Sequence, residues 1–113
     1  MVKEQNLNAI FAALAHPTRR AMLARLAKGN RSVGELAQPF KLSGPAITKH
    51  LHVLEEAGLV SRSVGGRVHI VRLEAQPLKN AAAWIQAYSS FWQGQFDALE
   101  EFLRKTNQPD SGR

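Results

Sequence analysis

The sequence contains no cysteine, and this absence excludes several classes of protein. Disulfide scaffolds, thiolate metal sites and thiol redox sensors all need cysteine side chains. The sequence also has no apolar run long enough to cross a bilayer, and its first residues lack the apolar core of a signal peptide. We therefore expect a cytoplasmic protein that does not enter a membrane.

Acidic residues are scarce: nine Asp and Glu accompany fifteen Lys and Arg, which gives a formal net charge of +6. The excess lies in the middle of the chain, because residues 16–79 hold eleven Lys or Arg and only four Glu. A basic body of this kind is typical of proteins that contact phosphate groups of nucleic acids. Enzymatic activity is not expected, since the chain has no Gly-rich phosphate loop and no carboxylate pair facing a histidine.

The length of 113 residues predicts one domain with a modest core. We expect this domain to span residues 1–105, with helices at both of its ends that serve dimerisation. The last segment, residues 106–113, reads TNQPDSGR and is polar throughout. It is therefore expected to be a disordered tail.

Residues 32–60 carry the signature of a helix-turn-helix motif. Ser32 and Glu35 have the spacing of a capping box, which starts a first short helix. Ser43 is suited to cap a second helix, and Gly58 is suited to end it. Two helices separated by so short a turn are typical of this DNA-binding motif.

The second helix of this motif is predicted to have one packed face and one open face. At about 100° per residue, Ile47, Leu51 and Leu54 fall on one side of the helix. Recognition helices contact base edges mainly from their N-terminal half. We therefore expect DNA contacts from Ser43, Gly44, Pro45, Thr48, Lys49 and His52. The alternatives are that this face is merely solvated, or that it binds an acidic partner protein.

Residues 61–73 predict two antiparallel strands, because their apolar residues alternate loosely around Gly65-Gly66. A hairpin after a recognition helix forms a wing, whose arginines can reach a minor groove or phosphates. Arg62, Arg67 and His69 are therefore added to the DNA-binding candidates. The alternative is that these side chains protect an edge strand from pairing.

Two helices are predicted before the helix-turn-helix motif. Leu7, Ile10, Phe11 and Leu14 follow the spacing of a helix with one buried stripe. Pro17 is suited to the first turn of the next helix, which continues to Gly29. The predicted fold class is mostly α with a small two-stranded antiparallel wing, in the order α-α-α-α-β-β-α.

A long helix is predicted over residues 78–105, and it carries six of the eight aromatic residues. Its apolar surface is broader than one packing stripe, so we expect the same helix of a second chain to cover it. The alternative is a ligand pocket lined by the aromatic rings. The residues expected at the dimer interface are Leu7, Phe11, Trp84, Ile85, Tyr88, Trp92, Phe96, Leu99 and Leu103.

The chain resembles the ArsR/SmtB family of bacterial transcriptional regulators. The resemblance rests on ALAHPTRRAMLARLA, SVGELA, LSGPAITKHLHVLEEAGLV and the GR of the wing, and it covers about residues 7–103. It implies a homodimeric winged helix-turn-helix protein, usually a repressor, that binds a palindromic DNA operator. It also implies that the candidates on the second helix of the motif read DNA and that Arg67 lies in the wing.

The chain departs from the metal-sensing members of that family. Where they carry a pair of cysteines, this chain has Glu35-Leu36-Ala37-Gln38-Pro39, and its terminal helix has acidic residues but no histidine. His50 and His52 are two residues apart, which is not the spacing of a chelating pair on a helix. We therefore expect no cofactor and no metal effector, and the sequence identifies neither the operator nor another effector.

Overall fold

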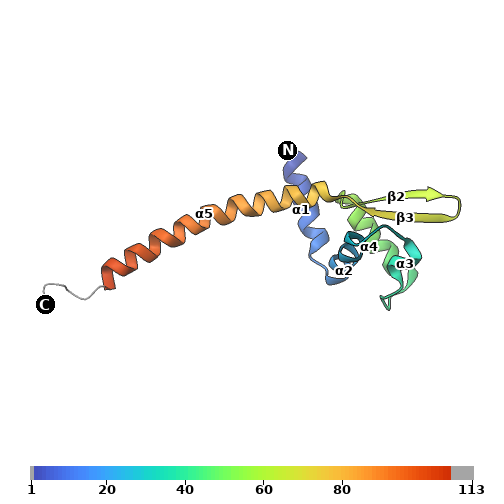
Figure 1. The fold of residues 1–113 in the computed structure, drawn as a ribbon, viewed down its shortest axis with the longest axis horizontal. Helices are drawn as coiled ribbons and strands as arrows, with labels where there is room; N and C mark the ends of the chain where they lie inside the picture. Colours follow the sequence, from blue (N-terminus) through green and yellow to red (C-terminus); the bar gives the residue numbers. More distant parts are fainter. Residues whose placement is uncertain (1, 108–113) are drawn as a thin grey trace, which may run out of the picture. The chain divides into compact units, whose positions relative to one another are not determined.

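The computed structural model describes the backbone of residues 2–107 and the side chains of residues 7–106. Figure 1 shows a chain that is mostly helical and carries a projecting β-hairpin, which confirms the predicted fold class. The elements in chain order are α1 (Val2–Leu14), α2 (Pro17–Ala27), β1 (Arg31–Ser32), α3 (Val33–Ala37), α4 (Gly44–Glu56), β2 (Val60–Gly65), β3 (Val68–Leu73) and α5 (Ala75–Asn107).

Polar side chains fix where the short helices begin. The hydroxyl of Ser32 accepts a hydrogen bond from the backbone N–H of Glu35 at 3.1 Å, and the Glu35 carboxylate accepts one from the Ser32 N–H at 2.9 Å. This capping box begins α3, and the same hydrogen bonds hold the pKa of Glu35 below its usual value. The Ser43 hydroxyl caps α4 by accepting from the N–H of Ala46. Both predicted N-caps are confirmed.

Three strands form one antiparallel sheet in the order β1-β3-β2. The third strand, β1, adds to the predicted hairpin and pairs Ser32 with Ile70. This strand could not be predicted, because two residues are too few for an alternating pattern. In the hairpin Gly65 pairs with Val68, so Gly66 and Arg67 form the turn, one residue later than the predicted Gly65-Gly66. Gly66 has the positive φ of +64° that this turn needs.

The core lies between the helices α1 to α4 and the base of the hairpin. Ile10, Leu36, Leu51, Leu54 and Val71 are almost completely buried, and so are side chains of α2. The predicted packed face of α4 is therefore confirmed. Gly58 follows α4 with a φ of +74°, which lets the chain reverse into β2.

Two arginines in the first turn of α2 bond to the end of α1. Arg19 donates from Nε to the carbonyl oxygen of Ala13 at 2.7 Å and from Nη2 to that of Ala12 at 3.0 Å. Arg20 donates to the carbonyl oxygen of Leu14. These carbonyls lie in the last turn of α1, where backbone acceptors lack helical partners. The sharp connection around Pro17 is thus held by side chains as well as by packing.

The described residues form two compact units, one that ends at Ala81 and one that begins at Ala82. The helix α5 begins three residues before the predicted start and includes Pro77, which is tolerated in a first turn because those N–H groups have no helical acceptor. It continues through Asn107, and the rest of the expected tail, residues 108–113, lies outside the described residues. None of the helices among the described residues is long and apolar enough to span a membrane.

Candidate nucleic-acid interface

The outward face of α4 carries short polar and basic side chains. Thr48, Lys49 and His52 are exposed, while Ile47 and Leu51 on the opposite face are buried. His52 lies 3.5 Å from the carboxylate of Glu56, and both side chains are about two-thirds exposed. A pair so open to water adds little stability and leaves the imidazole accessible. This face can therefore approach another molecule closely.

The N-terminal end of α4 is equally open. Ser43, Gly44 and Pro45 are all exposed, and the Ser43 hydroxyl is engaged by the helix cap. All six of the sequence-predicted DNA-binding residues on α4 and its cap are thus exposed, and all but His52 lie at the cap or in the N-terminal half of the helix. Short side chains at such an end can approach base edges, and the helix dipole favours phosphate there.

The wing projects from the helical part of its unit (Figure 1). Residues 63–68 are exposed on both strands and in the turn. Arg67 occupies the second position of the turn and is exposed. A long cationic side chain at the tip of a projecting hairpin can reach phosphates or a minor groove.

Arg62 differs from Arg67, because its guanidinium is already paired. Its Nε and Nη2 donate to the two carboxylate oxygens of Glu55 at 3.0 and 2.8 Å. About a quarter of each side chain is exposed. The Glu55 carboxylate raises the pKa of Arg62 above its usual value. This pair could not be predicted from the sequence, since its members belong to different elements and approach each other only because the chain reverses at Gly58.

An open hollow of about 400 Å³ lies between the start of α3 and the wing. Three DNA-binding candidates, Arg62, Arg67 and His69, line it together with Val68 and residues 32–34. No carboxylate of the described residues lines the hollow. His69 is half-buried, and its Nδ1 is buried without a hydrogen-bond partner among the described residues. The hollow is therefore a basic depression beside the wing.

A second basic cluster joins α4 to the connection between α1 and α2. Nη1 of Arg19 donates a hydrogen bond to Nδ1 of His50 at 3.1 Å, and the ring centroid of His50 lies 4.5 Å from that of His16. Burial lowers the pKa of His50, and the nearby positive groups lower it further. His50 thus faces inward and His52 faces outward, as their spacing of two residues predicts. The structural role of the inward histidine was not predicted.

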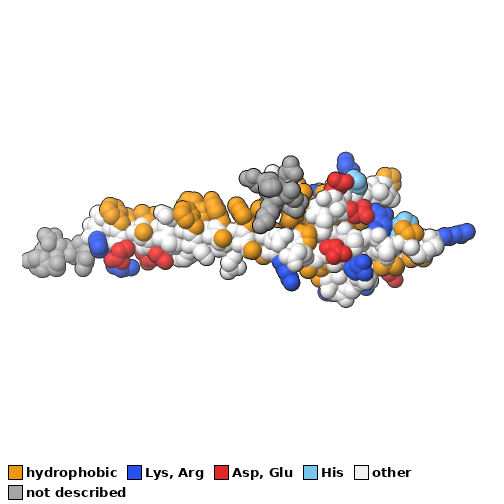
Figure 2. Space-filling model, turned by 90° about the horizontal axis from the view of Figure 1, so that it is seen from above, with side chains coloured by type: hydrophobic (Ala, Val, Ile, Leu, Met, Phe, Trp, Pro, Cys, Tyr) orange, Lys and Arg blue, Asp and Glu red, His pale blue; other side chains and the backbone are white. Residues whose placement is uncertain are grey.

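Apolar side chains form a continuous line on one element of the surface. Figure 2 shows this line along α5, with charged side chains near the end of that helix and Lys and Arg side chains over the part of the chain that includes the wing. On α5 the rings of Trp84 and Tyr88 stack at 5.2 Å between centroids, and Trp92 contacts Tyr88 and Phe96 at 5.8 and 5.9 Å. Neighbouring rings thus follow one side of the helix.

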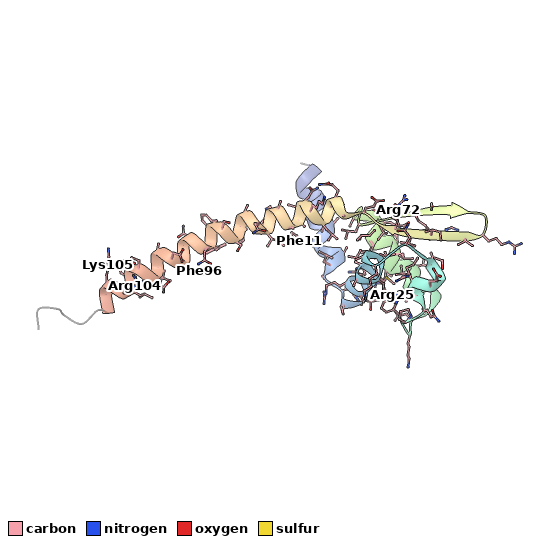
Figure 3. All side chains as sticks on the ribbon, in the orientation of Figure 1. Phe11, Arg25, Arg72, Phe96, Arg104 and Lys105 are labelled. Carbon is pink, nitrogen blue, oxygen red and sulfur yellow. The ribbon has the colours of Figure 1, made fainter. Side chains whose placement is uncertain are left out.

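The apolar side of α5 is large and exposed. Phe96 is 57% exposed and is labelled on α5 in Figure 3. The exposed fractions lie between 40% and 63% for Trp84, Ile85, Tyr88, Phe91, Trp92, Phe96, Leu99, Phe102 and Leu103. Seven of these were predicted as interface residues; Phe91 and Phe102 were not. The other two predicted residues, Leu7 and Phe11, are half-buried and pack against the core of the first unit.

Potential metal ligands do not gather in the described part of the chain. No group of three or more His, Asp or Glu side chains there has the geometry to hold a metal ion. The Glu35 carboxylate already takes part in the cap of α3, because its Oε1 accepts a hydrogen bond from the backbone N–H of Ser32.

Comparison with known proteins places this geometry among transcriptional regulators. Residues 14–62 match the model of a helix-turn-helix domain family. The chain is 32% identical to the transcriptional repressor SdpR of Bacillus subtilis over 70% of this chain and 88% of that protein. It is 41% identical to the HTH-type transcriptional regulator Rv2034 of Mycobacterium tuberculosis, over 73% of this chain and 74% of that one. An ArsR-like transcriptional regulator from Rhodococcus sp. RHA1 has a similar structure, with a TM-score of 0.76, 28% identity, and 90% and 96% of the two chains covered.

Proposed function

The chain belongs to the ArsR/SmtB family of winged helix-turn-helix transcriptional regulators, and we propose that it acts in the cytoplasm as a homodimeric repressor of a palindromic operator. DNA binding and a role in transcription follow from that membership, and the protein is not an enzyme. The proposal adds the dimer, the symmetry of the operator, the sign of regulation and the residues that make each contact.

The open face of α4 is the observation that carries the proposal. Thr48, Lys49 and His52 stand free of the core on a helix whose opposite side is buried. A helix of this width fits the major groove, where each base pair presents a distinct set of donors and acceptors. In this arrangement Thr48 meets base edges, Lys49 meets a base or a phosphate, and Arg67 at the wing tip meets the backbone or the adjacent minor groove.

The exposed side of α5 supports self-association. A large aromatic side chain can bury about 150–250 Å², so nine half-exposed apolar side chains offer on the order of 900 Å². Soluble monomers rarely expose contiguous apolar patches of more than a few hundred Å². A standard protein interface buries about 800 Å² on each partner. A second copy of the same helix would cover this surface and form a two-fold symmetric dimer.

A two-fold dimer explains why the operator should be palindromic. Two recognition helices related by a two-fold axis meet two half-sites of opposite direction, about 34–36 Å apart, one turn of the duplex. We propose repression rather than activation of transcription by analogy, because one of the similar proteins is itself named a transcriptional repressor. A bound dimer acts in this way when its operator overlaps a promoter.

The chemistry of the chain favours regulation without a metal. It has no cysteine, and the inward and outward directions of His50 and His52 prevent the two rings from chelating one ion. We propose that the signal, where one exists, is an organic molecule, a partner protein or the concentration of the regulator itself.

Selection of bound sequences from random duplex DNA tests the proposal. The enriched sequences should contain an inverted repeat with half-sites one helical turn apart, and the complex should contain two chains per duplex in sedimentation. Enrichment of a single asymmetric half-site by one chain would contradict the dimer and the palindrome. Absence of any duplex affinity at low salt would contradict DNA recognition through α4.

A further inference from the structure

The ion pair between Glu55 and Arg62 lies where the wing leaves the core. In the hairpin register Arg62 pairs with Val71, which is completely buried. Val60, two residues before Arg62, is also buried, whereas Val64, two residues after it, is 62% exposed. Side chains two apart on a strand share a face. Arg62 is therefore the last residue of β2 on this face that is held by the body of its unit.

The pair joins the wing directly to the recognition helix. Among the described residues, Glu55 and Arg62 are the two side chains that connect α4 to β2 by hydrogen bonds. Two guanidinium nitrogens of Arg62 each donate to a different carboxylate oxygen of Glu55. The pair therefore fixes the relative orientation of the two side chains as well as the distance between them. A half-buried bidentate pair is also stronger than the exposed pair of His52 and Glu56 on the same helix.

The tip of the wing has no comparable side-chain pair among the described residues. Residues 63–68 are exposed, and the turn that holds Arg67 begins four residues beyond Arg62, about 13 Å along the strand. A small rotation of the hairpin at Arg62 therefore shifts the Arg67 side chain by several ångströms relative to α4. An interface made by α4 and the wing together binds more tightly when that relative position is fixed before binding, because less ordering is needed.

We propose that Glu55 is a positioning residue for DNA binding, which acts through Arg62 to hold the wing, and with it Arg67, in register with the recognition helix. The proposal rests on the proposed function, in which α4 and the wing bind one duplex. It assigns a favourable role to an acidic side chain on a DNA-binding helix. Electrostatics alone assigns the opposite role, because a carboxylate repels the phosphate backbone.

Whether Glu55→Gln weakens or tightens DNA binding distinguishes these two roles. Removing a negative charge should tighten DNA binding if the carboxylate only repels phosphates. We expect Glu55→Gln instead to weaken binding to the selected operator by about three- to tenfold, a range typical of coupling between contacting residues. Glu56→Gln is the matched control, since it removes the same charge from the neighbouring residue. The Glu56 side chain is exposed and pairs with His52, which is exposed as well. The control should bind equally well or more tightly.

A double-substitution cycle tests whether Glu55 acts through the wing. In an Arg67→Ala background, Glu55→Gln should not weaken binding further, because the contact that Glu55 positions is already absent. Circular dichroism and thermal unfolding of each variant report whether α4 and the core remain intact. Partial unfolding would weaken binding in both backgrounds, and that outcome would overturn the proposal.

The outcomes for the inference and for the proposed function are distinct. A wild-type protein that binds no duplex contradicts DNA recognition by α4 and the wing. A wild-type protein that binds its operator, with Glu55→Gln as tight as Glu56→Gln or tighter, overturns the positioning role alone. In that case Arg62, released from its partner, contributes charge to the phosphate contacts rather than holding the wing.

Discussion

Replacing Arg19 by alanine removes the contacts that tie three helices together. The guanidinium of Arg19 bonds to the carbonyl oxygens of Ala12 and Ala13 at the end of α1 and to the ring of His50 on α4. Two of these three hydrogen bonds are partly buried. A hydrogen bond to a charged group contributes about 1.5–3 kcal/mol, and less where water competes. We therefore expect Arg19→Ala to lower the free energy of unfolding by about 2–4 kcal/mol.

Arg20→Ala is the control for this substitution. Arg20 is the same residue type on the same turn, but it makes one exposed hydrogen bond, to the carbonyl oxygen of Leu14. Its loss should cost less than about 1 kcal/mol. Urea unfolding followed by far-ultraviolet circular dichroism at equal protein concentrations measures both values, which avoids the concentration dependence of an associating protein. Equal losses for the two variants would refute the account of the α1–α2 connection.

Three further predictions concern association, pH and metals. Replacing Trp92 and Phe96 together by serine should yield monomers or insoluble protein in sedimentation velocity, whereas a monomeric wild type at micromolar concentration would refute the α5 dimer. Burial lowers the pKa of His50 in the folded protein, so the histidine binds a proton more readily in the unfolded chain. The contribution of His50 to the free energy of unfolding should therefore be fully present above the ordinary pKa of 6.5 and should fall as the pH drops below it. Unfolding measured from pH 7.5 to 5 should show that loss, and His50→Gln should flatten it. Adding zinc or a chelator should leave operator affinity unchanged, and a tenfold change, about 1.4 kcal/mol of coupling, would contradict metal independence.

The parts of the fold that could be predicted from the sequence depend on contacts between near neighbours in the chain. The capping box of Ser32 and Glu35, the cap at Ser43 and the reversal at Gly58 each involve a few consecutive residues, and all three are present. The period of the apolar residues in α4 likewise fixed which face is buried. Such signals are encoded locally and need no knowledge of the tertiary structure.

The parts that could not be predicted depend on residues brought together by folding. The pairing of Arg62 with Glu55 needs the chain to reverse after α4, and the contact of His50 with His16 needs α4 to cross the start of α2. The hairpin turn lies one residue later than predicted, because either glycine of the Gly65-Gly66 pair can adopt a positive φ. For Thr48 and Arg67 the structure gives exposure on suitable elements, and their contacts with DNA stay predictions.

The central claim is that α4 reads sequence while the wing adds affinity that does not depend on sequence. Binding of Thr48→Ala and Arg67→Ala to the selected operator and to random duplexes, across a range of salt concentrations, tests it most directly. Arg67→Ala should weaken binding to both duplexes and lower the slope of log affinity against log salt by about one unit. Thr48→Ala should cost about 1–3 kcal/mol on the operator and little on random DNA. If Thr48→Ala binds both duplexes as the wild type does, the outward face of α4 is not the surface that reads the operator.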